Sequence, residues 1–167
     1  MQIIISKEKI SERVKELGKR ITSDYQNKSL IVLCTLKGSI IFFADLIREI
    51  ELELETEFIR ASSYGKEKTS SGDVKLAFPS ALSLIGKHVL LVEDIIDTGM
   101  TLDTIVNSLY TRNPVSIRVC SLLLKKDAAK PKTQIDYVGF EIGNEFVVGY
   151  GLDYAEKHRN LNDICII

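Results

Sequence analysis

The chain has 167 residues, a length typical of one domain, so we expect a single domain over residues 1–167. Hydrophobic residues make up 45% of it and charged residues 27%, the balance of an ordinary globular protein. The formal net charge of −1 gives no overall positive field, which argues against nucleic acid as a partner. The most apolar stretch, residues 39–47, is too short to span a membrane, and the apolar start of the chain is too short for a signal peptide. We therefore expect a cytoplasmic protein that binds neither nucleic acid nor membrane.

The first third of the chain predicts a helix, a buried strand and a second helix. Ser6 is placed to cap the first helix. Apolar residues then recur at helical spacing, at Ile10, Val14, Leu17 and Ile21. Residues 30–35 form a continuous apolar run, which is typical of a strand buried on both faces. A turn over residues 36–39 and a helix over residues 40–50 follow.

The next segment predicts a strand and then a long loop. Residues 51–58 alternate strictly between glutamate and mostly apolar residues, which indicates a half-buried strand with a solvated acidic face. A cation site on this acidic face is the weaker alternative. Residues 62–73 are polar and rich in Ser, Gly and Lys, so they predict a mobile loop. Loops of this length inside a compact domain are often functional lids.

The second half of the chain continues the alternation of strands and helices. We expect one helix over residues 102–110, and strands over residues 89–92, 116–124, 135–140 and 146–150. This alternation predicts an α/β fold with a mainly parallel sheet flanked by helices. Ligands of such sheets bind beyond the carboxyl ends of the strands. The turns at residues 36–39 and 93–101 should both lie at that edge.

Residues 89–102 read VLLVEDIIDTGMTL and carry most of the functional signal. The apolar strand is expected to end in two adjacent carboxylates, Glu93 and Asp94, and Asp97 follows. The turn Thr98–Thr101 then leads into a helix. A glycine in that turn permits close backbone approach, its threonines supply hydroxyl groups, and the helix start adds positive potential. No Gly-Lys-Ser/Thr follows, so this is not a nucleotide-triphosphate loop of the Walker type. We expect it to bind a single phosphate group.

The acidic pair beside this turn narrows the ligand further. Adjacent carboxylates suit a ribose diol or a hard cation such as magnesium. Together with a phosphate loop they indicate a sugar phosphate, and Asp97 lies where a base could reach the reacting centre. The alternative is an ordinary polar loop in which Asp97 caps the helix. Three acids and two threonines within nine residues argue against that alternative. A phosphatase is disfavoured, because nothing supplies a nucleophile with its own acid.

The segment closely resembles the motif that binds 5-phosphoribosyl 1-pyrophosphate (PRPP) in type I phosphoribosyltransferases. From Leu30 to the C-terminus, the chain is also similar to the hypoxanthine-guanine branch of that family. The further matching motifs, in chain order, are Leu36-Lys37-Gly38, Ser62-Ser63-Tyr64-Gly65, Leu123-Leu124-Lys125, Val138-Gly139-Phe140-Glu141, Phe146-Val147-Val148-Gly149-Tyr150, Leu152-Asp153-Tyr154 and Arg159-Asn160-Leu161. Residues 126–134 match no motif, and we expect them to touch no part of the site.

The resemblance implies a fold, an activity and an assembly. The fold is that of type I phosphoribosyltransferases, with a small hood region and a mobile lid loop. The activity is purine salvage: hypoxanthine or guanine reacts with PRPP to give IMP or GMP and pyrophosphate, with Mg²⁺ as the helper ion. The assembly is a homodimer or homotetramer. The residues fix no preference among hypoxanthine, guanine and xanthine.

On the ribose-phosphate side, the resemblance assigns three acidic residues and one loop. Glu93 and Asp94 would hold the ribose hydroxyls and magnesium. Asp97 would manage the proton on the purine nitrogen that forms the new bond. The cradle for the 5-phosphate would be made by Thr98, Gly99, Met100 and Thr101.

On the pyrophosphate side, the resemblance implies a set of groups that close around the leaving group. Lys37 and Gly38 would present their backbone to it, and the family often has a cis peptide bond before that lysine. Arg159 would contact the pyrophosphate, which suits a guanidinium group. Tyr64 would close over it from the lid and exclude water, with Ser63 beside it in the substrate site.

On the base side, the resemblance assigns four residues. Lys125 would donate to the oxo group at position six of the purine, which favours an oxo purine over adenine. Phe146 would stack on the base, and Val147 would read its edge through the backbone. Asp153 would lie near the base and a second magnesium. Without the resemblance, Lys125 would be interpreted as a solvated lysine, and Phe146 and Val147 as core residues.

Two alternatives to this enzyme remain open. Regulators exist that keep the PRPP motif without catalysis, but they usually need a partner-binding module. This chain has no spare length for one, and it keeps the lid and base-pocket motifs. A transferase for a different base is disfavoured by Lys125 and by the pair Phe146 and Val147.

Overall fold

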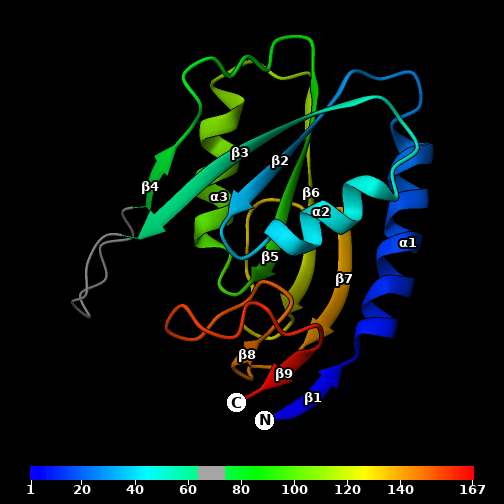
Figure 1. Ribbon diagram of the computed structural model, residues 1–167. Coiled ribbons are helices and arrows are strands. Elements are labelled where there is room, and N and C mark those ends of the chain that lie inside the picture. The colour runs from blue at the N-terminus through cyan, green and yellow to red at the C-terminus, as the bar shows by residue number, and fades with distance from the viewer. Residues whose placement is uncertain (64–73) are drawn as a thin grey trace.

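The computed structural model describes residues 1–63 and 74–167, and a six-stranded sheet lies at its centre (Figure 1). The strand order is β4-β3-β2-β5-β6-β7, and every pair is parallel except β3 with β4. The strands are β2 (Leu30–Leu36), β3 (Leu54–Ser63), β4 (Val74–Ala77), β5 (His88–Ile96), β6 (Ser116–Lys125) and β7 (Tyr137–Ile142). The predicted α/β fold with a mainly parallel sheet is confirmed.

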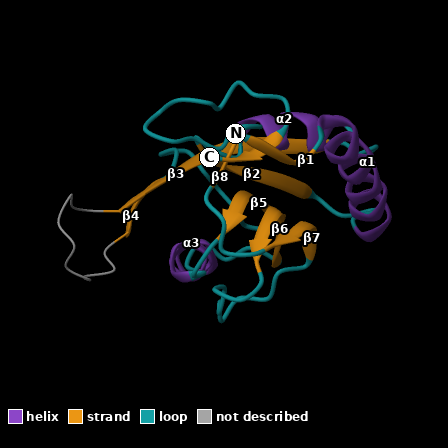
Figure 2. Cartoon of the chain, turned by 90° about the horizontal axis from the view of Figure 1, so that it is seen from below, coloured by secondary structure: helices purple, strands orange, loops and turns teal. Residues whose placement is uncertain are grey.

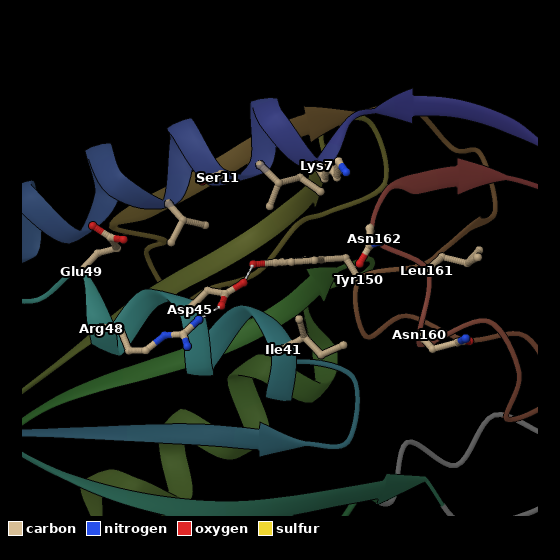
Figure 3. Close-up of a pocket in the computed structure, with 12 residues that line it drawn as sticks. Lys7, Ser11, Ile41, Asp45, Arg48, Glu49, Tyr150, Asn160, Leu161 and Asn162 are labelled. Atoms are coloured by element: carbon tan, nitrogen blue, oxygen red, sulfur yellow. Dashed lines mark hydrogen bonds and ion pairs between the residues drawn. The ribbon is translucent and has the colours of Figure 1, made fainter.

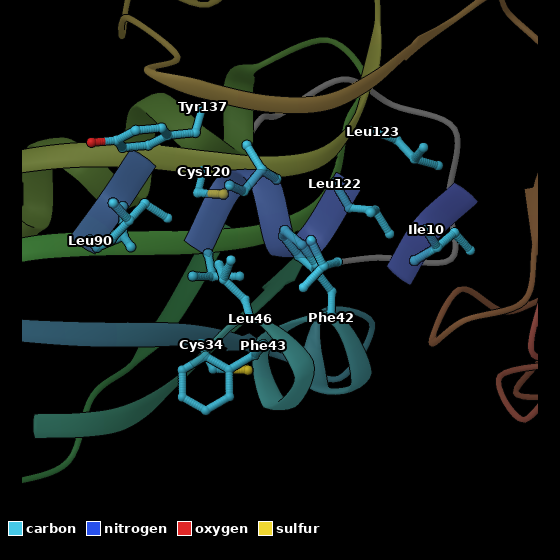
Figure 4. Close-up of a cluster of buried hydrophobic side chains, with 14 of the residues drawn as sticks. Ile10, Cys34, Phe42, Phe43, Leu46, Leu90, Cys120, Leu122, Leu123 and Tyr137 are labelled. Atoms are coloured by element: carbon cyan, nitrogen blue, oxygen red, sulfur yellow. The ribbon is translucent and has the colours of Figure 1, made fainter. Parts of the chain in front are cut away.

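Three helices cover the two faces of this sheet. Helices α1 (Lys7–Asp24) and α2 (Ile40–Arg48) lie on one face, and α3 (Met100–Tyr110) lies on the other (Figure 2). Each face of the sheet has its own buried hydrophobic cluster. The cluster beneath α1 and α2 contains Phe42, Leu46, Cys120 and Tyr137, with little or no exposed surface (Figure 4). None of the described helices is long and apolar enough to cross a membrane.

A second, small sheet lies beyond the carboxyl ends of the central strands and forms the hood (Figure 1). It consists of β1 (Gln2–Ile5), β9 (Ile164–Ile166) and β8 (Val147–Val148) in the order β1-β9-β8. Both of its pairings are antiparallel. The start and the end of the described chain are therefore held together beside the site.

Several predicted boundaries are wrong. The strand expected at residues 51–58 begins at Leu54 and continues to Ser63. It continues because its last four residues pair with β4. The polar composition of residues 62–73 gave no sign of this pairing. Most of that predicted lid loop lies outside the described residues. The alternation also misplaced Phe58, which is 40% exposed and lies against Phe43 at the sheet edge.

The most consequential boundary is the end of β5. The strand was expected to stop at Val92, but it continues to Ile96 because its backbone keeps pairing with β6 up to Leu124. Glu93 and Asp94 are therefore residues of a strand, with the rigidity that the ladder provides. Helix α3 also begins two residues earlier than predicted. The strand predicted at residues 135–140 is shifted to Tyr137–Ile142 (β7), and the one predicted at residues 146–150 is shortened to Val147–Val148 (β8).

Candidate functional site

A cavity of about 250 Å³ opens at the carboxyl ends of β2 and β5. Most of the residues predicted for the ribose phosphate line it: Glu93, Asp94, Asp97, Thr98, Gly99 and Thr101. Gly38, which was predicted for the pyrophosphate, lines it too. Met100 does not line it, because its side chain points outward from the first turn of α3 and is 60% exposed. The topology brings the two informative turns together, as the rule for open parallel sheets requires.

Glu93 is a buried carboxylate with one side-chain partner. Only 7% of the residue is exposed, and the Thr35 hydroxyl donates to its Oε1 at 2.9 Å. Burial, reinforced by the adjacent Asp94, raises the pKa of Glu93 to about 8, and the bond from Thr35 opposes that rise. The site thus holds a carboxyl group that a cation or a set of hydroxyl donors would stabilise in its charged form.

Asp94 lies directly against the backbone of the turn after β2. A Cβ atom at Gly38 would lie 1.7 Å from Asp94 Oδ2, so a larger residue at this position would displace the carboxylate. The Ile95 amide donates to the other oxygen at 2.9 Å. Burial raises the pKa of Asp94, while that amide and Arg159 oppose the rise. The peptide bond between Leu36 and Lys37 is cis, as the resemblance implied.

The turn before α3 has the geometry expected of a phosphate loop. Gly99 has a φ of +90°, in the region that favours glycine, and it is the N-cap residue of α3. The N-cap residue Gly99 has no side chain, and the Asp97 carboxylate bonds to Lys125 and not to an amide of the first turn, so the alternative that Asp97 is a helix cap is wrong. The Met100 amide approaches the Thr98 hydroxyl at 3.4 Å. The helix start faces the cavity, where its amides and dipole favour an anion.

Residues 126–134 do touch this turn, contrary to expectation. The Lys130 amide donates to the Thr98 carbonyl at 3.1 Å. A Cβ atom at Gly99 would lie 2.7 Å from Cβ of Pro131, so that glycine is also required by contact with this segment. A segment without a recognisable motif therefore forms one wall of the phosphate loop.

Asp97 and Lys125 meet although they are far apart in sequence. Lys125 Nζ donates to Asp97 Oδ2 at 3.0 Å, from the end of β6 across to the end of β5. The Lys125 side chain is 13% exposed and that of Asp97 is 55% exposed. The residue proposed for the proton and the residue proposed for the oxo group are thus adjacent.

A network of charged groups lies on the pyrophosphate side. Arg159 donates to the Gly151 carbonyl at 2.8 Å and forms ion pairs with Asp153 at 2.8 Å and with Glu156 at 3.3 Å. The second carboxylate oxygen of Glu156 lies 2.9 Å from Lys37 Nζ. One carboxylate therefore bridges the side chains of Arg159, which was predicted to contact pyrophosphate, and of Lys37, whose backbone was predicted to contact it.

This network borders a second cavity of about 460 Å³. It is lined by four cationic side chains and one acidic one: Lys37, Arg60, Lys75, Arg159 and Glu156. Positive charge of this density suits a polyanion. Ser63 ends the strand beside it, and Tyr64 lies outside the described residues.

The base side is more open. Phe146 is 55% exposed and meets the Tyr154 ring edge to face, with ring centroids 5.7 Å apart. Val147 is buried in β8. Neither residue lines the cavity at Glu93. Phe146, the predicted stacking residue, therefore lies at the hood and outside the cavity that contains Glu93 and Asp94.

Sequence reasoning missed several residues of the site, among them Thr35 and Glu156. Thr35 was read as part of an apolar strand, and its hydroxyl gave no signal of a buried carboxylate as its partner. Glu156 lies in a turn with positive φ at residues 155, 156 and 158. An acidic residue in a polar turn is ordinary, so only the fold reveals that it bridges two cations.

A third cavity, of about 330 Å³, lies between α1, α2 and the segment of residues 150–162 (Figure 3). The Tyr150 hydroxyl donates to Asp45 of α2 at 2.5 Å across one side of it. None of the predicted site residues lines this cavity.

The model of the phosphoribosyl transferase domain family matches residues 3–155. The chain is 45% identical to the hypoxanthine phosphoribosyltransferase of Haemophilus influenzae, over 98% of this chain and 93% of that one. It is 44% identical to the hypoxanthine-guanine phosphoribosyltransferase of Bacillus subtilis, over 99% and 92%. A solved hypoxanthine-guanine phosphoribosyltransferase of Bacillus anthracis has a TM-score of 0.94 and 42% identity, and the match covers 100% of this chain and 98% of that one. The motif, the fold and the sequence identity over nearly the whole chain thus agree, and the chain belongs to the phosphoribosyltransferase family.

Proposed function

We propose that this protein is a purine salvage enzyme that joins hypoxanthine or guanine to the ribose phosphate of PRPP. The products are IMP or GMP and pyrophosphate. One observation carries the proposal: the acidic pair of β5, Asp97 and three residues of the following loop, Thr98, Gly99 and Thr101, line a single cavity. The identity to hypoxanthine and hypoxanthine-guanine phosphoribosyltransferases supports the choice of an oxo purine.

The ribose phosphate would bind with its 5-phosphate at the loop Thr98–Thr101. The amides at the start of α3, the threonine hydroxyls and the positive end of the helix are suitable donors for that phosphate. Glu93 and Asp94 would accept hydrogen bonds from the two ribose hydroxyls. Both carboxylates sit on a paired strand, so their separation is fixed before the substrate arrives.

The reaction exchanges one bond at C1 of the ribose. The bond between C1 and the pyrophosphate oxygen breaks, and pyrophosphate leaves with the electron pair of that bond. A ring nitrogen of the purine forms a bond to the same carbon. That nitrogen must lose its proton, and Asp97 would accept it. Lys125 would donate to the oxo group of the base. An ammonium group has three N–H donors, so it can serve the base and Asp97 together.

On the leaving-group side, the backbone of Lys37 and Gly38 and the side chain of Arg159 would hold the pyrophosphate. Glu156 now bridges the two cationic side chains, and it would have to move away as the polyanion enters. Ser63 and Tyr64 would close over the site and exclude water that could hydrolyse PRPP. Phe146 would stack on the base, with the Val147 backbone at its edge.

The donor set fits magnesium in part. Glu93 and Asp94 offer the carboxylate oxygens that a hard cation prefers. Asp153 fits less well, because its two oxygens already accept from Arg159 and from the Glu156 amide. Among residues 1–63 and 74–167, no three side chains of the types that bind metals converge. Magnesium usually keeps waters and substrate oxygens alongside one or two carboxylates. When bound, the ion would neutralise charge on the leaving pyrophosphate.

The assembly and the location are proposals that rest on the resemblance to the family. We propose a homodimer or homotetramer in the cytoplasm, made of one phosphoribosyltransferase domain per chain. Size-exclusion chromatography with light scattering would measure the assembly directly.

The activity can be tested with purified protein, PRPP and MgCl₂. Hypoxanthine, guanine, xanthine and adenine are supplied separately, and nucleotide and pyrophosphate are measured together. We expect IMP or GMP with equimolar pyrophosphate, little product from adenine, and none after chelation of divalent ions. Absence of turnover with all three oxo purines would refute the proposal.

A further inference from the structure

Asp103, in the first turn of α3, binds a distant stretch of backbone. Its Oδ2 accepts from the Lys132 amide at 2.9 Å, and its Oδ1 accepts from the Thr133 amide at 2.8 Å. The two partners lie 29 and 30 positions further along the chain, after β6. A carboxylate that accepts two backbone N–H groups forms charge-assisted bonds, which are stronger than neutral ones.

The stretch that Asp103 holds is the one that covers the phosphate loop. Immediately before its two bonded amides, Pro131 lies against Gly99, and the Lys130 amide donates to the Thr98 carbonyl at 3.1 Å. Asp103 is also bonded to the loop through its own backbone, because its amide donates to the Gly99 carbonyl at 3.0 Å. The side chain of Asp103 therefore closes a ring of contacts around the loop.

The other end of the same stretch begins at the base side of the site. Lys125 is followed by a turn in which the amides of Ala128 and Ala129 donate to its carbonyl. Lys125 itself is paired with Asp97. Residues 125–133 thus run from the base side of the cavity to the phosphate side, and Asp103 fixes the far end.

We propose that Asp103 is a positioning residue, which holds residues 130–133 over the loop Thr98–Thr101 so that the loop is shaped before PRPP arrives. Asp103 does not line the cavity at Glu93, so it acts through the loop and does not touch the substrate. An enzyme gains affinity when such a loop needs no ordering on binding. This inference rests on the proposed function, because it takes the 5-phosphate of PRPP as the ligand.

The test compares three variants with the wild type. Asp103→Ala removes both bonds, and Asp103→Asn keeps one carbonyl oxygen for one of the two amides. Asp127→Ala removes an exposed carboxylate of the same segment and serves as the matched control. The measurements are the KM for PRPP, the KM for hypoxanthine, kcat, the melting temperature, and amide exchange of residues 98–101.

We expect Asp103→Ala to raise the KM for PRPP about tenfold, which corresponds to about 1.4 kcal/mol. We expect kcat to stay within about twofold, because the reacting groups are untouched. Amide exchange of residues 98–101 should become faster, Asp103→Asn should lie between Asp103→Ala and the wild type, and Asp127→Ala should match the wild type. An unchanged KM for PRPP, or an equal change in Asp127→Ala, would overturn the inference.

A binding experiment separates this inference from the activity itself. Ribose 5-phosphate is titrated into each variant, and binding is followed by calorimetry. If the wild type turns over no oxo purine, the proposed function fails, yet weaker binding of ribose 5-phosphate by Asp103→Ala would still support the role of Asp103. If the wild type is active and ribose 5-phosphate binds equally to both, the positioning role is rejected.

Discussion

Lys125 Nζ lies 3.0 Å from Asp97 Oδ2, so the two residues proposed to act on the base form an ion pair with each other. The pair joins the ends of two adjacent parallel strands. It places a donor and an acceptor side by side, which is the pattern that an oxo group and a neighbouring ring N–H would require. Each partner can be removed separately, and the two losses should differ in kind.

Replacing Lys125 with alanine should weaken selection of the base more than binding of PRPP. The lost interaction would be the proposed charge-assisted hydrogen bond to the oxo group, worth about 1.5–3 kcal/mol. The KM for hypoxanthine should rise, and the discrimination against adenine should fall. Lys126→Ala is the control, since Lys126 is exposed and pairs with Glu141. Normal affinity of Lys125→Ala for hypoxanthine would show that the lysine does not contact the base.

Replacing Asp97 with asparagine should lower turnover and leave PRPP binding largely intact. Asparagine keeps the shape but cannot accept a proton, and loss of general acid–base help typically costs about 10²–10⁴-fold in rate. The acidic pair and the phosphate loop remain. Single-turnover rates and equilibrium binding of PRPP measure the two effects. Near-normal turnover would leave Asp97 with only its ion pair to Lys125.

Thr35→Val should destabilise the protein by about 1–3 kcal/mol, because it leaves the buried Glu93 without its hydroxyl donor. Valine has nearly the same shape as threonine, so packing should change little. Thr35→Ser keeps the hydroxyl and is the control. Urea unfolding at neutral pH without ligands gives the difference. If the valine variant is as stable as the serine variant, the bond contributes nothing to the fold.

Glu156→Gln should lower the KM for PRPP. The carboxylate bridges Lys37 and Arg159, so it competes with the pyrophosphate group for both cations and repels it. Exposed ion pairs are worth about 0–1 kcal/mol, so we expect a decrease of no more than about fivefold. Steady-state kinetics at low ionic strength would measure it, with product inhibition by pyrophosphate as a second readout. A higher KM would mean that Glu156 orients the cations productively.

The Asp103 bonds also predict a dependence of stability on pH. Burial raises the pKa of this carboxyl, but the bonds from the Lys132 and Thr133 amides outweigh that effect and leave the pKa below its usual value of 3.8. The stabilisation is therefore fully present above about pH 4 and is lost as the pH falls through the lowered pKa. The stability difference between the wild type and Asp103→Asn should shrink as the pH falls from 6 toward 3. A constant difference would mean that the carboxylate charge plays no part.

Contiguous patterns predicted the central sheet and much of the site. The strands β2, β5 and β6 each contain an apolar run, and the motif from Glu93 to Thr101 is a single segment. Periodicity did not reveal β1, β4 and β9, because strands of three or four residues are too short to display it. The continuation of β5 past Val92 was hidden by its two carboxylates, which occupy a strand only because they face the site.

Pairs that join distant residues were beyond local reasoning. Thr35 donates to Glu93 across 58 positions, and Lys37 meets Glu156 across 119. A threonine in an apolar strand and a glutamate in a polar turn each have ordinary explanations. The same holds for residues 126–134, whose role depends on where the chain returns after β6. Only the packing of the strands identifies these partners.

The order of strands in the hood has a consequence for how the protein is made. The middle strand, β9, is the last of the described strands to be synthesised. Among the described strands, β8 pairs with β9 alone. A strand of two residues has no stability of its own. Domains generally fold as units, and the first and last of the described strands pair in this sheet, so the hood can form only once β9 has left the ribosome. The part of the hood that carries Val147 should therefore be completed only after all the other described strands have been synthesised.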